Sequence, residues 1–168
     1  MPLLFFFAVS MPACADGWHD DLPQAKRVGG GDFSWFGLSI YSAALWSEHL
    51  PFSADAPFAL ELTYHRKISR ERFVKTSIDE IQRLSGGNLS ADKSARWENE
   101  LSHAFVDVSP GDKLIGVFLP SIGCRFYNQK ERIADITDIE LAKAFFSIWL
   151  DARSKDEQLR KQLLGTSQ

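Results

Sequence analysis

The chain has 168 residues and a formal net charge of −3, and 45% of its residues are hydrophobic, including 13 Phe and 5 Trp. This length and composition indicate one globular domain with an aromatic-rich core. The net charge is too small to indicate binding to nucleic acid or attraction to an acidic membrane surface.

The first fifteen residues are typical of a secretion signal. Leu3–Val9 is an apolar run, and Ala13-Cys14-Ala15 matches an A-x-A cleavage site. The run is too short for a stable membrane span, which needs about 20 apolar residues. No Lys or Arg precedes it, as expected if the true start codon lies upstream. We therefore expect residues 1–15 to be a signal peptide and residues 16–168 to form a domain in the periplasm or outside the cell. A lipoprotein anchored at Cys14 and a retained, buried N-terminal element are the alternatives.

The next part of the chain is predicted to be strand-rich. Phe33–Trp46 is interpreted as one long strand, with Trp35 and Tyr41 on the same face. The Gly29–Gly31 run before it is interpreted as a bend or bulge between two strands, because it lacks the Lys-Ser/Thr of a phosphate loop. Pro57–Lys67 alternates between apolar and polar residues, which predicts another strand.

Helices and strands then follow in turn. A helix is expected from the N-cap Ser69 to Leu84, where apolar residues recur at helical spacing. The remaining expected elements are a helix from about Ser90, strands at Lys113–Leu119, Gly123–Asn128 and Arg132–Ile136, a helix capped by Thr137 with Glu140, and a helix at Asp156–Leu164. Hairpin-like strand connections favour an antiparallel sheet with helices on one face, an α+β fold.

Groups with catalytic potential are sparse. The four histidines lack metal-ligand spacing, so no metal and no cofactor are expected. No Ser-His-Asp set has a recognisable sequence context. Cys124 has no neighbouring base and is expected to be a small buried hydrophobe. The basic run from His65 to Arg72 either forms a carboxylate-binding group or is a solvated turn.

The crease between the strand at 57–67 and the helix after Ser69 is the first candidate for a ligand site. Aromatic side chains near it either line an apolar cavity or belong to the core. The candidate ligand-binding residues are Trp35, Tyr41, Tyr64, Arg66, Phe73 and Ser77.

Several segments, taken in order, resemble the chalcone isomerase-like proteins of bacteria, over residues 28–164. The most specific are Tyr41-(x)3-Leu45, Pro110-Gly111-Asp112, Phe126-Tyr127 and Phe145-Phe146-x-Ile148-Trp149-Leu150. The resemblance implies an open-faced β-sandwich. In this fold a long antiparallel sheet is covered by helices, and an apolar ligand cleft lies between them.

The resemblance also implies that the family's chemistry is missing. The plant isomerases use an Arg near the first long strand, a Tyr early in the first helix and an Asn further along it. These positions fall near Gly31–Phe33, Phe73 and Glu80, and none carries the required residue. Phe73 has no hydroxyl to stabilise an enolate or orient water. The Arg and Tyr pair with which fatty-acid-binding members hold a carboxylate is absent too, unless Arg66 or Tyr41 replaces it.

We therefore expect an exported domain that is non-catalytic. It would bind a small apolar, amphipathic or fatty-acid-like ligand, or a protein partner. The alternative is an isomerase, an intramolecular lyase, whose active site has moved to Tyr41, Tyr64 or Arg66. Convergence of Arg66 and the Tyr41 hydroxyl on one cavity would favour ligand binding, whereas exposure of both to solvent would count against it.

Overall fold

The computed structural model describes residues 17–166, and the predicted signal peptide lies outside this range. Six strands form one antiparallel sheet in which each strand pairs with the next in sequence. The strands are β1 (Lys26–Trp35), β2 (Leu38–Ser47), β3 (Phe58–Tyr64), β4 (Lys113–Leu119), β5 (Gly123–Tyr127) and β6 (Arg132–Ile136). The predicted antiparallel sheet of an α+β fold is confirmed.

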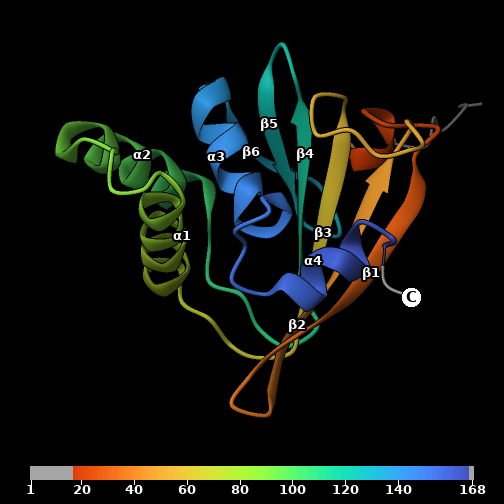
Figure 1. Ribbon diagram of the computed structural model, residues 1–168, viewed down its shortest axis with the longest axis horizontal. Helices are drawn as coiled ribbons and strands as arrows, with labels where there is room; N and C mark the ends of the chain where they lie inside the picture. Colours follow the sequence, from red (N-terminus) through yellow and green to blue (C-terminus); the bar gives the residue numbers. More distant parts are fainter. Residues whose placement is uncertain (1–16, 167–168) are drawn as a thin grey trace, which may run out of the picture.

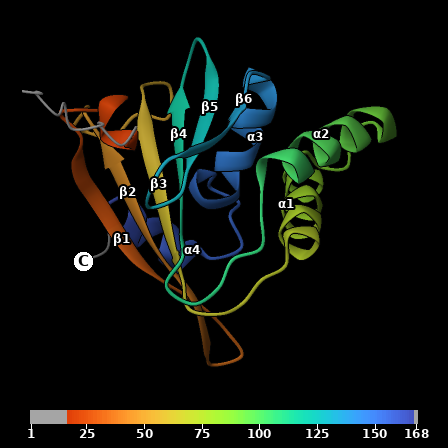
Figure 2. The ribbon, with the colours of Figure 1, turned by 180° about the vertical axis from the view of Figure 1, so that it is seen from behind.

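Four α-helices cover one face of the sheet (Figures 1 and 2). They are α1 (Arg70–Leu84), α2 (Ala91–Ala104), α3 (Ile139–Leu150) and α4 (Glu157–Leu163). Helices α3 and α4 pack against the strands, α1 packs on α3, and α2 contacts α1 and β6. A short 3-10 helix, Trp18–Asp20, precedes β1. Its Trp18 joins a small cluster with Leu22 and Val117, which is separate from the main core. No helix within residues 17–166 is long and apolar enough to cross a membrane.

Local capping explains where the helices begin. The Ser69 side chain accepts a hydrogen bond from the Arg72 backbone N–H at 3.3 Å, as predicted, and Ser90 caps α2 in the same way. The cap of α3 was wrongly predicted as Thr137. The Asp138 side chain accepts from two backbone N–H groups, those of Glu140 and Leu141, because a carboxylate can satisfy two of the free donors of the first turn.

The prediction of one strand at Phe33–Trp46 was wrong. The chain reverses at Phe36 and Gly37, whose φ angles are 47° and 75°, and Trp35 pairs with Leu38 across the turn. Positive φ at both central residues is the geometry of a two-residue hairpin turn. Gly37 suits that geometry, whereas Phe36 gives no sequence signal for it, so the turn was missed.

The glycine run lies inside β1 rather than between two strands, although a register shift does occur between Arg27 and Gly29. A Cβ added at Gly29 would lie 2.0 Å from the Gln162 carbonyl oxygen, and one at Gly31 would lie 1.9 Å from the Gln162 side chain. The glycines therefore allow the end of α4 to approach the backbone of β1 closely.

Candidate functional site

Aromatic rings fill the space between the sheet and the helices. Tyr64 of β3 is fully buried and lies edge-to-face with Phe73 of α1, with ring centroids 6.1 Å apart. Phe73 stacks on Phe105 at 4.5 Å, and Phe105 lies against Phe126 and Phe145. This part of the strand–helix crease is therefore packed core, and a cleft lies at its edge.

A cleft of about 190 Å³ opens where Phe73 reaches that edge. Its apolar wall contains Phe73 and Phe105, and Val106 is 60% exposed beside them. Its remaining lining comes from the α2–β4 loop and β4 and from the β5–β6 turn with the start of β6, namely Asp107, Val108, Asp112, Lys113, Leu114, Asn128, Gln129, Lys130 and Ile133. The cleft thus combines an apolar wall with polar and charged groups on the same rim.

Two ammonium groups border this cleft. Lys113 Nζ lies 3.1 Å from a Glu61 carboxylate oxygen, so its charge is already paired. Lys130 is exposed, and its backbone N–H donates to the Asn128 side chain at 2.7 Å, which fixes the turn that carries it. Lys130 is therefore the better placed of the two to meet an anionic group entering the cleft.

Tyr41 and Tyr64 lie beside each other, with ring centroids 6.1 Å apart. The Tyr41 hydroxyl accepts a hydrogen bond of 3.0 Å from the Trp149 indole N–H. The Tyr64 hydroxyl has no hydrogen-bond partner among the described residues. Burial raises the pKa of both hydroxyls above the ordinary value of about 10. Neither phenol is therefore suited to lose a proton near neutral pH.

The other sequence-predicted residues lie apart from the cleft, although Ser77 is bonded to Phe73. Ser77 is buried, and its hydroxyl donates to the Phe73 carbonyl at 2.9 Å within α1. Arg66 is exposed and donates from Nε to the Ser39 carbonyl at 3.4 Å, and Trp35 lies at the exposed β1–β2 turn. The structure brings Tyr41, Tyr64 and Phe73 together as one aromatic row, and it does not bring Arg66 to the Tyr41 hydroxyl.

A polar chain on β1–β3 was missed by the sequence reading. The Ser42 hydroxyl donates to Asp32 at 2.5 Å and lies 2.8 Å from His65 Nε2. Because this hydroxyl proton points to Asp32, the histidine is the donor to Ser42 and does not act on it as a base. A nucleophilic triad needs the histidine between the other two groups. In residues 17–166 no cluster of three or more His, Cys, Asp and Glu side chains is arranged to hold a metal.

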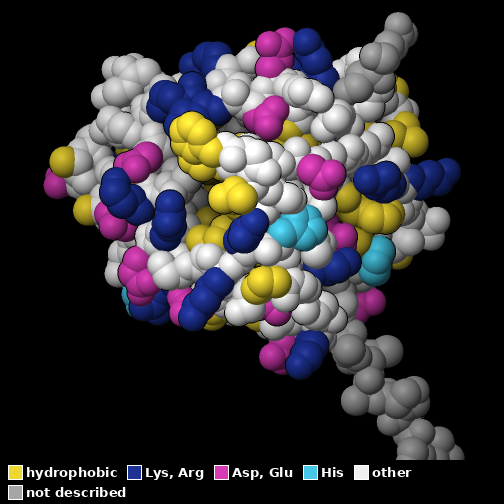
Figure 3. Space-filling view, turned by 90° about the horizontal axis from the view of Figure 1, so that it is seen from below, with side chains coloured by type: hydrophobic (Ala, Val, Ile, Leu, Met, Phe, Trp, Pro, Cys, Tyr) yellow, Lys and Arg dark blue, Asp and Glu magenta, His cyan; other side chains and the backbone are white. Residues whose placement is uncertain are grey.

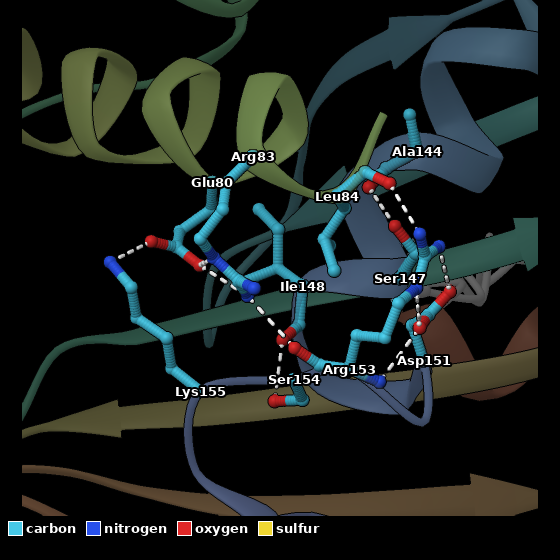
Figure 4. Close-up of polar contacts among 10 residues, drawn as sticks. All are labelled: Glu80, Arg83, Leu84, Ala144, Ser147, Ile148, Asp151, Arg153, Ser154 and Lys155. Carbon is cyan, nitrogen blue, oxygen red and sulfur yellow. Dashed lines mark hydrogen bonds and ion pairs between the residues drawn. The ribbon is translucent and has the colours of Figure 1, made fainter. Parts of the chain in front are cut away.

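Glu80 is a buried carboxylate near the C-terminal end of α1 (Figure 4). It accepts from Arg83 at 3.0 Å and also pairs with Lys155. Arg83 donates to the Arg153 carbonyl at 3.0 Å, and Arg153 donates to the Leu84 carbonyl at 2.8 Å. Glu80 therefore ties the loop after α3 to α1, and it does not face the Phe73 cleft.

A larger groove of about 340 Å³ lies among the end of α1, α2 and α3. The Lys93–Glu140 ion pair joins α2 to α3 on its lining, and the Lys93 ammonium lies 4.9 Å from the centroid of the Trp97 ring. Its charged groups are thus already engaged with one another. The Phe73 cleft, although smaller, has an exposed apolar wall and an exposed cation, so it is the better candidate for a ligand.

Comparisons with known proteins agree with this architecture. A family model described as chalcone isomerase-like matches residues 33–165. An uncharacterized protein of Haemophilus influenzae is 30% identical over 141 residues, which cover 83% of this chain and 68% of the relative. The solved structure of a fatty-acid binding protein of Arabidopsis thaliana superposes with a TM-score of 0.62 and 10% identity, covering 84% of this chain and 87% of that one. At this identity the likeness concerns the fold alone. The matched family model spans most of the chain, from the last residues of β1 to the end of α4, and the chain therefore belongs to the chalcone isomerase-like family.

Proposed function

We propose that the chain is a non-catalytic member of this family that binds a small apolar or amphipathic molecule in the Phe73 cleft. The observation that carries the proposal is the apolar wall formed by exposed Val106 and partly buried Phe73, with the Lys130 ammonium on the same rim. An apolar wall with a few polar groups that fix orientation is the usual composition of a small-molecule site. The fatty-acid binding protein of similar fold supports the same ligand class.

The volume of the cleft limits the size of the proposed ligand. Pockets for drug-sized ligands usually enclose about 300–1,000 Å³. The Phe73 cleft encloses about 190 Å³, and aromatic side chains fill the core behind it. We therefore expect it to take a short acyl chain or the end of a longer one, with a carboxylate left at the rim near Lys130.

Titration with fatty acids of graded length, followed by calorimetry, tests this proposal. Val106→Glu places a charge on the apolar wall at an exposed position, so the fold should survive. Burying that charge against an acyl chain should weaken binding about tenfold or more. Ile122→Glu is the matched control, because Ile122 is also exposed but lies in the β4–β5 turn and does not line the cleft.

A second pair of measurements tests the head group. Lys130→Gln should weaken the binding of carboxylates but leave that of the matching alcohols unchanged. No binding at about 1 mM ligand, which corresponds to roughly −4 kcal/mol, would remove the ligand proposal and leave a role with a protein partner. Equal binding by the Val106 and Ile122 variants would place the ligand elsewhere.

The absence of catalysis is tested with a chalcone ring-closure assay. We expect no rate above background, because burial raises the pKa of the described tyrosine hydroxyls and exposed Arg66 lies beside Ser39, away from them. A rate that Tyr64→Phe and Arg66→Ala both abolish would instead support the isomerase with a relocated site.

Export is proposed on the sequence of residues 1–15 alone. Cell fractionation with mass spectrometry of the mature N-terminus tests it. Cleavage after Ala15 and recovery outside the cytoplasm are expected, whereas an intact N-terminus on a cytoplasmic protein would contradict export, and a lipid on Cys14 would identify a lipoprotein.

A further inference from the structure

The β1–β2 turn projects beyond the rest of the sheet (Figures 1 and 2). Its side chains are apolar and exposed. Trp35, Phe36 and Leu38 are 59%, 89% and 50% exposed. The rings of Trp35 and Phe36 pack edge-to-face at 5.1 Å, so the tip is one compact aromatic cluster. Side chains of this size on the most protruding part of a fold lose contact with water only when another surface covers them.

The backbone of the tip is unfavourable for the residue that it carries. Phe36 has φ of 47°, a region in which Asn, Asp and Gly are the usual residues and bulky side chains are rare. No described contact except that with Trp35 engages the Phe36 ring. Stability of the hairpin alone would favour Asn-Gly at these two positions, and the ring is therefore better explained by a contact outside the chain.

Basic side chains lie beside the base of the tip. The β2–β3 pairing continues past β3, where the His65 N–H donates to the Ile40 carbonyl at 2.8 Å and Arg66 Nε donates to Ser39. Exposed His65, Arg66 and Lys67 thus lie beside the base of the tip. Seen from below, this end of the molecule shows hydrophobic side chains among Lys and Arg, with Asp and Glu side chains interspersed (Figure 3). The nearest carboxylate along the hairpin, Asp32, is paired with Ser42, further from the tip than Ser39.

The distance between the apolar tip and the basic residues beside its base fits a lipid surface. Arg66 contacts Ser39, which lies two residues from Gly37, so the apolar tip extends roughly 7 Å beyond the cation at 3.3 Å per residue. Apolar faces of interfacial elements penetrate about 5–10 Å into the boundary between head groups and acyl chains, and Trp is enriched at that depth. Arg66 and Lys67 would then lie at the level of anionic head groups.

Protein partners fit the tip less well. A specific protein interface buries about 800 Å² on each side, with some 20–30 residues. The apolar tip consists of three residues on a narrow projecting turn. The carboxylates of the neighbouring α2–β4 loop, Asp107 and Asp112, accept backbone hydrogen bonds from Arg70 and Ser109.

We propose that the β1–β2 tip, Trp35–Leu38, inserts into the surface of a bilayer that contains anionic lipid, with Arg66 and Lys67 contacting the head groups.

Cosedimentation of the full chain with vesicles at low ionic strength tests this proposal. Binding is expected with phosphatidylcholine that contains phosphatidylserine, and weaker binding with phosphatidylcholine alone. Phe36→Asn installs the favoured Asn-Gly turn, so it should preserve or raise the melting temperature while weakening vesicle binding about tenfold or more. Ile122→Asn, at the β4–β5 turn, should stay within about twofold of the parent chain.

Two further variants separate the apolar contribution to vesicle binding from the electrostatic one. Trp35→Phe should still bind, but the blue shift of the Trp emission on adding vesicles should be lost. The Arg66→Gln, Lys67→Gln double variant should lose about tenfold or more of the binding to anionic vesicles, and little of that to neutral ones. Because every variant carries the same residues 1–15, any affinity of that apolar segment for lipid is common to all.

Three outcomes would overturn the proposal. Absence of the parent chain from the sedimented anionic vesicles would leave the tip for a protein partner. Equal vesicle binding by Phe36→Asn and the parent chain would assign lipid binding to another segment. Light scattering that shows a dimer for the parent chain and a monomer for Phe36→Asn, without vesicle binding, would assign the tip to a second copy of the chain.

Discussion

The Glu80 cluster should contribute measurably to stability, and Glu80→Gln tests how much. The Glu80 side chain is 9% exposed and pairs with Arg83 and Lys155. Removing one partner of a fully buried ion pair costs about 3–5 kcal/mol, because the other charge stays buried. Here Lys155 is 65% exposed and Arg83 is also partly exposed, so both cations can be solvated again. The glutamine oxygen also still accepts from Arg83, and we therefore expect a loss of about 1–2 kcal/mol.

Urea and thermal unfolding measure this loss. For a chain of this size, about 1 kcal/mol corresponds to roughly 2–4 °C in Tm, so a fall of about 2–8 °C is expected. Glu157→Gln is the matched control, because Glu157 forms a similar pair with Lys161 on the surface of α4. Exposed pairs contribute less than about 1 kcal/mol. Amide exchange should also accelerate in residues 151–156 of the Glu80 variant. Equal losses for the two variants, with unchanged exchange, would refute the proposed tie between this loop and α1.

Two predictions concern pH. Burial raises the pKa of every tyrosine hydroxyl. The pKa of Tyr127 rises to about 12, and its hydrogen bond to Asp21 contributes to this increase. Tyrosinate absorbance should therefore be absent from the folded protein until well above pH 10. Because the folded pKa values exceed the unfolded value, the contribution of these hydroxyls to stability is complete below about pH 10 and is lost as the pH rises towards 12. Titration of the tyrosines near pH 10 in the native state would contradict the burial of these groups. Hydrogen bonds from Arg153 lower the pKa of Asp151, so its contribution is complete above the unfolded value of about 3.9 and is lost as the pH falls through the folded value. Asp151→Asn should therefore lower the free energy of unfolding by up to about 1 kcal/mol at neutral pH, and the difference should vanish in acid; a difference that persists unchanged at acid pH would contradict this assignment.

The sequence predicted the elements from β3 onwards because their signals are local. Helix α1 has a clear period and an N-cap serine, and β4 and β5 flank a short turn. The β1–β2 hairpin was missed for the opposite reason. Its turn residue Phe36 contradicts the usual turn chemistry, and Gly29–Gly31 suggested a break although these residues are needed inside β1 against α4. Prediction from local sequence failed at positions where a contact outside the strand determines which residue is present.

The cleft was only partly predictable. Phe73 was identified from the crease between strand and helix, and it does line the cleft. Val106, Lys130 and Ile133 were missed, because nothing local to them indicates that the β5–β6 turn lies beside the start of α1. Such proximity depends on long-range strand pairing. Arg66 was chosen for its charge and its closeness in sequence, and the structure places it on the exposed surface beside Ser39, outside the cleft.

The positions that carry the chemistry of the active isomerases have structural roles in this chain. The resemblance places the helical tyrosine near Phe73 and the asparagine near Glu80. Phe73 stacks on Phe105 and closes the aromatic core, so a hydroxyl on its ring would face apolar side chains or the small cleft. Glu80 points to Arg83 and Lys155, and a neutral amide would weaken that tie. Restoring the family's residues one at a time would therefore disturb packing or ion pairing without assembling a site, because Tyr64 is buried, the Tyr41 hydroxyl is bonded to Trp149 and Arg66 lies elsewhere. The binding proposed at the edge of the core requires none of these groups.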